Sequence, residues 1–155
     1  MIKSRAVFAA SAVFLSAALA AGYFFQNREA DIKPYQVLTW DCEYAAYKPK
    51  SIMIYCGDGG AYISKIKWKT WNKDGATGTG EYYRNLCEPD CADGEIVHAP
   101  VKVSLSELTP RKRKFYLRTL DMSSATGKDF PWSESGVFKW DVMEFAENMI
   151  EAKNA

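Results

Sequence analysis

Few side chains in this sequence have the types and spacing that catalysis needs, and the histidine count sets the first limit. His98 is the only histidine among 155 residues, so a site with several histidine ligands is excluded. His98 can act only as a single acid or base. Its apolar neighbours Val97 and Ala99 are typical of a strand, and we expect a structural or surface role for it.

Paired carboxylates are the second route to chemistry. Glycoside hydrolysis needs two acids about 5 to 10 Å apart. Four acids lie close together in the sequence: Asp58, Glu81, Asp90 and Asp93. Most of them stand beside glycine or proline, where acids commonly stabilise turns. A small cell-envelope hydrolase is therefore an alternative hypothesis, and the sequence carries no G-x-S-x-G, P-loop or dinucleotide-binding motif.

The four cysteines indicate disulfides, because their number is even and all follow an amino-terminal apolar segment. Three pairings exist. The sequence favours Cys42–Cys56, since each ends an apolar run as neighbouring strands would place them, and Cys87–Cys91, since these two can close a small loop. A four-cysteine zinc site is the competing interpretation, but only its second spacing resembles a metal knuckle. We expect neither a metal nor a cofactor.

Basic residues offer the one route from this sequence to a partner. Lysines alternate along one predicted strand, and further basic residues lie on segments that could neighbour it: Lys65, Lys67, Lys69, Lys102 and Arg113. If they share a face, they form a patch that attracts anionic cell-envelope polymer or lipid headgroups. The alternative is an ordinary solvated strand face balanced by the nineteen acids. A net charge of +1 and the predicted export disfavour nucleic acid.

Tryptophans could stack on sugars, although core packing is their commoner role. Trp68 falls on the predicted core face. Trp71 and Trp132 lie near predicted loops and are the better candidates for a sugar.

The elements that carry these residues are mostly strands. The clearest spans 62–71, with Tyr62, Ser64, Ile66 and Trp68 on the core face and the three lysines on the other. Gly78-Thr79-Gly80 is explained by hairpin geometry. Further strands are expected at 35–42, 51–56, 79–85, 95–105, 115–120 and 137–140. Within 141–153, apolar residues recur at helical spacing. This predicts an amphipathic helix, which Asp141 can cap. The predicted fold is mainly β, an antiparallel sandwich or small open barrel, with one C-terminal amphipathic helix.

The amino terminus predicts export. Lys3 and Arg5 precede an uncharged stretch at 6–25. This order is typical of a signal peptide, with Ala18-Leu19-Ala20 as a cleavage site, and an uncut stretch of this length would span a bilayer as an anchor. Both interpretations stay open. The predicted organisation is a signal peptide or transmembrane anchor at 1–25, a linker at 26–34 and one disulfide-containing β domain at 35–155.

One block of the sequence resembles an uncharacterised family of small exported actinobacterial proteins. The block comprises 55–60 (YCGDGG), Trp68, Trp71, 76–80 (ATGTG), 85–94 (NLCEPDCADG) and 101–103 (VKV). The resemblance covers about fifty residues. It implies an extracytoplasmic domain and supports the disulfides, and it implies no activity. The segment after Leu108 lies outside it.

The resulting hypothesis is an exported, disulfide-stapled domain, secreted or anchored to the outer face of the cytoplasmic membrane, that binds an envelope or extracellular partner. A secreted enzyme inhibitor is a third hypothesis, by analogy of fold alone. An enzyme should place two acids, or His98 and an acid, in a common cleft. A binding protein should instead expose a basic or aromatic patch.

Overall fold

The computed structural model describes residues 32–42, 44–111, 114–132 and 134–148, and the compact unit considered below is Lys33–Ala155. The predicted signal peptide or anchor, residues 26–31 of the linker and Arg113 lie outside the described residues. Within the described part, no helix has the length and apolar character to cross a membrane.

Eight strands and two short helical segments make up the described part of the domain. In chain order the structure contains η1 (Pro34–Gln36), β1 (Val37–Asp41), β2 (Tyr44–Ala46), β3 (Ile52–Met53), β4 (Ala61–Asn72), β5 (Gly75–Asn85), β6 (Ile96–Arg111), β7 (Lys114–Ser124) and β8 (Val137–Asp141), followed by a helix at 144–148. The predicted fold class, mainly β with one C-terminal helix, is confirmed.

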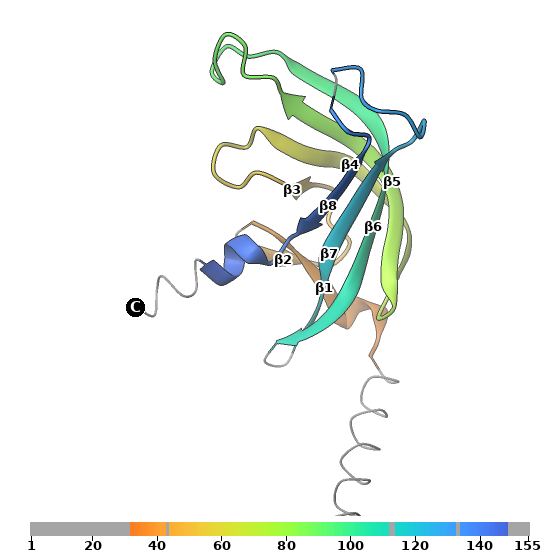
Figure 1. Cartoon of the computed structure of the whole chain (residues 1–155). Helices are drawn as coiled ribbons and strands as arrows, with labels where there is room; N and C mark the ends of the chain where they lie inside the picture. The colour runs from red at the N-terminus through yellow and green to blue at the C-terminus, as the bar shows by residue number, and fades with distance from the viewer. Residues whose placement is uncertain (1–31, 43, 112–113, 133, 149–155) are drawn as a thin grey trace, which may run out of the picture. The chain divides into compact units, whose positions relative to one another are not determined.

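All eight strands belong to one sheet, in the order β2-β1-β7-β6-β5-β4-β3, with β8 also paired to β7. The four long strands β4–β7 form an antiparallel meander, and only the β1–β7 pair is parallel. Figure 1 shows these long strands curving into a wall, with the short strands and the C-terminal helix on the side toward which the wall curls. Of the two predicted architectures, the domain is therefore the open barrel.

The core lies on the inner side of this curled sheet. Every second residue is buried from Ala99 to Leu105 in β6 and from Leu120 to Ser124 in β7, as the pleat of a strand requires. The largest fully buried side chains come from six strands and the turn after β8: Tyr82, Ile52, Ile63, Leu105, Leu117, Leu120, Met122, Met143, Val37, Val101 and Thr39. Met143 comes from the turn after β8, so the C-terminal segment closes part of the core.

Strand β4 departs from simple alternation because it contains two β-bulges. Ser64 pairs with Glu81 and Lys67 with Thr79, so Lys65 and Ile66 together oppose one residue, Gly80. The backbone of Lys65 is left-handed, with φ 54°. Lys69 is the extra residue of the second bulge, between the Trp68–Gly78 and Thr70–Thr77 pairs.

These bulges correct the predicted faces of the strand. Ile63, which lies between the predicted core residues Tyr62 and Ser64, is fully buried, as is Ala61. Tyr62 and Ser64 therefore point outward rather than into the core. The first bulge restores Ile66 to the inner face, and the three lysines all remain exposed.

Gly78-Thr79-Gly80 lies in the hairpin that β4 and β5 form. The turn of this hairpin lies between Asn72 and Gly75, and the two glycines sit inside β5 opposite the bulges of β4. A Cβ on Gly78 would lie 2.8 Å from the Lys67 carbonyl oxygen, and one on Gly80 would lie 2.9 Å from the Ser64 carbonyl oxygen. Glycine is required there because β4 approaches too closely for any side chain.

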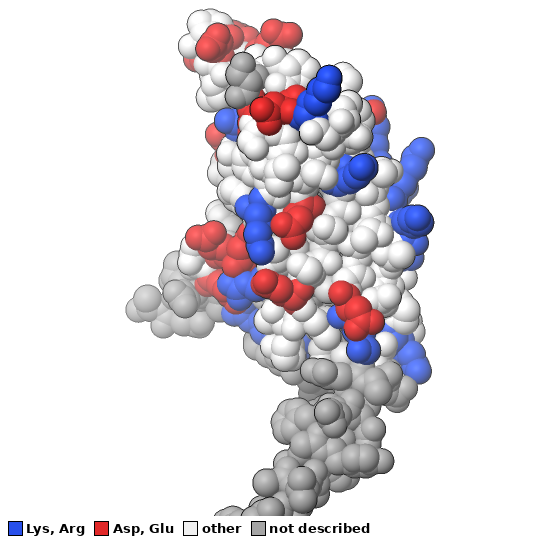
Figure 2. Space-filling view, turned by 45° about the vertical axis from the view of Figure 1, so that its right-hand side comes forward, with Lys and Arg blue, Asp and Glu red and all other residues white. Residues whose placement is uncertain are grey.

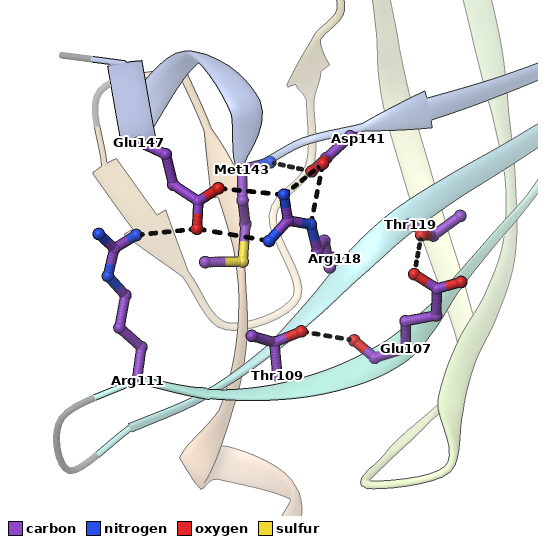
Figure 3. A network of polar contacts seen from close by, with 8 residues as sticks. All are labelled: Glu107, Thr109, Arg111, Arg118, Thr119, Asp141, Met143 and Glu147. Carbon is purple, nitrogen blue, oxygen red and sulfur yellow. Dashed lines mark hydrogen bonds and ion pairs between the residues drawn. The ribbon is translucent and has the colours of Figure 1, made fainter. Parts of the chain in front are cut away.

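An ion-pair network fastens the C-terminal helix to the sheet (Figure 3). The Arg118 guanidinium on β7 donates to Asp141 at 2.6 and 2.8 Å and to Glu147 at 3.0 and 3.3 Å. Arg111 reaches the same Glu147 at 3.3 Å. Asp141, predicted to cap the helix, is instead the last residue of β8, and it accepts a hydrogen bond from the backbone N–H of Met143 in the turn that leads into the helix at 144–148.

The disulfides are Cys42–Cys56 and Cys87–Cys91, the pairing that the sequence favoured. The first ties the end of β1 to the loop after β3. The second closes the loop between β5 and β6. No cysteine among the described residues is free, so none can serve as a thiolate ligand for zinc. Two disulfides are compatible with an oxidising compartment outside the cytoplasm.

Candidate functional site

The outer face of the sheet carries a groove with a volume of about 490 Å³. We call it the lysine groove, because Lys67, Lys69 and Lys102 line it. Hydroxyl side chains, one acid and one apolar residue line the rest: Thr77, Thr79, Ser104, Ser123, Asp121 and Val137, with backbone from Gly78, Val103 and Met122.

Strand register explains why these residues meet. One row across the sheet pairs Lys67 with Thr79, Thr79 with Lys102, and Lys102 with Ser123. Because neighbouring strands lie about 4.8 Å apart, the Cα atoms of Lys67 and Lys102 are roughly 10 Å apart with one hydroxyl between them. The next row pairs Thr77 with Ser104 and Ser104 with Asp121.

The groove lysines lack acidic partners. None of Lys67, Lys69 and Lys102 forms an ion pair or a side-chain hydrogen bond with another described residue. Lys65 differs, because its ammonium lies 2.7 Å from the Glu81 carboxylate. The structure thus brings three of the five predicted basic residues into one groove. Lys65 lies outside the groove, where Glu81 neutralises its charge. Arg113 lies beyond the described residues.

Next to the groove, the Glu81 carboxylate accepts hydrogen bonds from two side chains. Lys65 and then the Tyr83 hydroxyl, at 2.6 Å, hold the pKa of the Glu81 carboxyl below its usual range, and Glu81 raises the pKa of the Lys65 ammonium. His98 lies 4.0 Å from the same carboxylate and stacks on Tyr83, with 60% of its side chain exposed. The predicted surface role of His98 fits this position.

Surface charge is unevenly distributed over the domain. Figure 2 shows Lys and Arg side chains gathered along the right-hand margin with few acidic side chains among them, whereas the two signs are interspersed over the rest of that view. In the lysine groove, Asp121 is the single acid against three lysines. The groove is therefore electropositive, with one acidic side chain in its wall.

A second concavity, of about 460 Å³, lies between the loop after β3 and the C-terminal helix. We call it the helix-side cleft. Aromatic and acidic side chains line it, including Tyr55, Trp140, Asp58, Asp141 and Glu144. The rings of Tyr55 and Trp140 meet edge to face, with centroids 5.5 Å apart. Asp141 is engaged by Arg118, which leaves Asp58 and Glu144 as the cleft's available carboxylates.

The four acids singled out from the sequence do not share a cleft. Only Asp58 lines the helix-side cleft, where it also accepts a hydrogen bond from the Gly60 N–H. Glu81 lies on the outer face, and Asp90 accepts from the backbone N–H groups of Ala92 and Asp93 in the disulfide loop. Proximity in sequence was no guide to proximity in space here, because Glu81 points outward from β5 whereas Asp58 and Asp90 lie in two different loops.

The tryptophan candidates for sugar stacking are also revised. Trp71 is only 5% exposed and donates from Nε1 to the Val37 carbonyl, so it belongs to the core. Trp132 stacks on Phe130 and donates to Glu134, which also accepts from the buried Tyr82 hydroxyl. Both indoles are committed to contacts within the domain.

Sequence reasoning missed the hydroxyls of the groove and Asp121. Thr79, Ser104 and Ser123 make no side-chain hydrogen bond with any described residue, so their polar groups are available to a ligand. The signal was present in parts of β6 and β7, where Val101, Val103, Leu120 and Met122 are buried and each is followed by a polar residue. Only the strand register reveals that these positions adjoin the lysines.

A scan of protein-family models, a search of curated proteins and a search of solved structures each found no match to this chain.

Proposed function

We propose that this protein is an exported, disulfide-stapled domain that binds an anionic component of the cell envelope through the lysine groove. The observation that carries the proposal is the convergence of Lys67, Lys69 and Lys102 around the hydroxyls of Thr79, Ser104 and Ser123. Within the described part of the chain, these lysines have no acidic partner and these hydroxyls no hydrogen-bond partner. Ammonium and hydroxyl donors together suit phosphate oxygens, which envelope polymers and lipid headgroups share. The domain would act outside the cytoplasm, secreted or anchored to the outer face of the cytoplasmic membrane.

Replacing the three lysines tests this function. The variant Lys67→Gln, Lys69→Gln, Lys102→Gln should lose about 2 kcal/mol of binding, which weakens affinity roughly thirtyfold. Cosedimentation with isolated envelope fragments at low salt measures it, and added salt should weaken the wild type in the same direction. A matched control replaces Lys48, Lys114 and Lys128, which are exposed and do not line the groove. Equal binding by the two triple variants would overturn the proposal.

Localisation needs a separate experiment. Cell fractionation with mass measurement of the chain should find the domain outside the cytoplasm. A chain that begins at Ala21 means secretion, whereas a full-length chain in the membrane fraction means an anchor. A full-length chain confined to the soluble cytoplasm would contradict export. Membership of the actinobacterial family that the sequence block resembles stays a prediction.

The helix-side cleft supports a second candidate function, a small envelope hydrolase. Asp58 and Glu144 are two carboxylates without ion-pair partners among the described residues, and they line one cleft together with aromatic rings. Glycoside hydrolysis uses a pair of carboxylates, and aromatic rings can stack on sugars. Release of reducing sugars from envelope fragments is the assay. Asp58→Asn and Glu144→Gln should each abolish release while leaving cosedimentation intact. No release by the wild type, or full release by both variants, would exclude this function.

A further inference from the structure

The hydroxyls of the lysine groove carry information about the ligand beyond its charge. Thr79 and Ser123 flank Lys102 in one row, and Ser104 lies in the next. Each can donate one hydrogen bond and accept two, and within the described part of the chain none is used. A ligand that supplies only negative charge would leave the accepting capacity of these groups unmatched.

The shape of the groove favours a single chain over a flat surface. Lysine side chains are long and can reach any anionic surface placed above the sheet. Serine and threonine hydroxyls are short, and Ser104 and Ser123 are only partly exposed, so a ligand must enter the groove to touch them. The apolar insertion residues of membrane-binding surfaces are nearly absent here, since Val137 at the rim is the single exposed large hydrophobic residue of the lining.

Asp121 adds selection against a continuous polyanion. Its carboxylate lines the groove beside Ser104 and has no ion pair or hydrogen bond among the described residues. An ionised carboxylate only accepts hydrogen bonds, so it repels a ligand with negative charge at every position and accepts a hydrogen bond from a ligand hydroxyl. A repeat that alternates anions with hydroxyl-bearing carbons meets both requirements.

We propose that the lysine groove binds one chain of a polyol phosphate, with phosphodiester groups at the lysines and polyol hydroxyls at Ser104, Ser123 and Asp121. This inference rests on the proposed function and names its ligand. The phosphate oxygens accept from Lys67, Lys102 and the Thr79 hydroxyl between them. The intervening carbon units donate to Asp121 and exchange hydrogen bonds with the serines.

The test is titration of the full domain with soluble probes at fixed ionic strength. The probes are a glycerol-phosphate oligomer, inorganic polyphosphate of equal charge, polygalacturonate, and phosphatidylglycerol vesicles. We expect the glycerol-phosphate oligomer to bind at least fivefold more tightly than polyphosphate. Asp121→Asn should narrow that ratio by strengthening polyphosphate binding, because the repulsive carboxylate is gone.

One double hydroxyl variant isolates the polyol contacts. Ser104→Ala combined with Ser123→Ala should weaken glycerol-phosphate binding about fivefold to tenfold and leave polyphosphate binding unchanged. Ser64→Ala is the matched control, since Ser64 points outward on β4 but does not line the groove. Circular dichroism confirms that each variant is folded.

The outcomes separate the two proposals. If the lysine variant alters no probe, the proposed function itself fails. If the lysine variant weakens every probe but the hydroxyl and Asp121 variants change none, only the polyol inference fails. Tighter binding of polyphosphate, polygalacturonate or vesicles than of glycerol phosphate would likewise overturn it and identify a simple polyanion, an acidic polysaccharide or a membrane surface as the ligand.

Discussion

Replacing Gly80 by alanine should destabilise the domain, because the new methyl group has no space. Its Cβ would lie 2.9 Å from the Ser64 carbonyl oxygen and 3.0 Å from Ile63 Cγ2. The first contact is with backbone, so strand β4 or β5 must move. Overpacking of this kind costs about 1–3 kcal/mol. Alanine also reduces the conformational entropy of the unfolded chain, which stabilises the folded domain by about 0.4–1 kcal/mol. The expected net loss is therefore about 1–2 kcal/mol.

Gly57→Ala is the matched control. No atom lies within 4 Å of the position that its Cβ would take, and its backbone is not left-handed. It should leave stability unchanged or raise it by about 0.5 kcal/mol. Urea unfolding of both variants gives the difference, and thermal unfolding of Gly80→Ala should occur about 4–8 °C lower than in the wild type. If Gly80→Ala proves as stable as Gly57→Ala, the close approach of β4 to β5 has been misjudged.

Three further predictions concern stability. Arg118→Met should lower the free energy of unfolding by about 1–2 kcal/mol, since the ion pairs of Arg118 are about one-third exposed. Combining it with Glu147→Gln in a double-mutant cycle should show coupling, and strict additivity would argue against the network. Serine replacement of Cys42 and Cys56 should cost about 3 kcal/mol in urea, because their bridge spans 14 residues, and an effect below about 1 kcal/mol would contradict this. Burial, chiefly, raises the pKa of Tyr82, so its neutral form contributes stability that is complete below about pH 10 and falls as pH rises through the folded-state pKa. Tyr82→Phe should therefore flatten the loss of stability above pH 10, and an unchanged alkaline slope would refute this.

Alternation and turn chemistry were sufficient to predict the fold class and most strands. The disulfide pairing was also predictable, since Cys42 and Cys56 each end an apolar run and such runs become neighbouring segments. Both arguments are local, because side-chain period and chain reversal depend on adjacent residues.

The faces of β4 were not predictable, because a bulge shifts the side-chain period by one residue without a clear sequence mark. Lys65 carries no signal that its backbone is left-handed. The lysine groove likewise required the register of four strands. Lys67 and Lys102 are 35 positions apart, and only the pairing of each with Thr79 shows that they adjoin.

The segment 76–80 shows how one short motif serves folding and the proposed binding at once. Its inward positions are Ala76, Gly78 and Gly80, which leave room for the two bulges of β4. Its outward positions, Thr77 and Thr79, line the groove. Because the bulges place the extra lysines on the outer face, the inward glycines determine where the cations stand relative to the threonines. Replacing the glycines should therefore lower both the stability of the domain and its binding. Thr79→Val should lower binding alone.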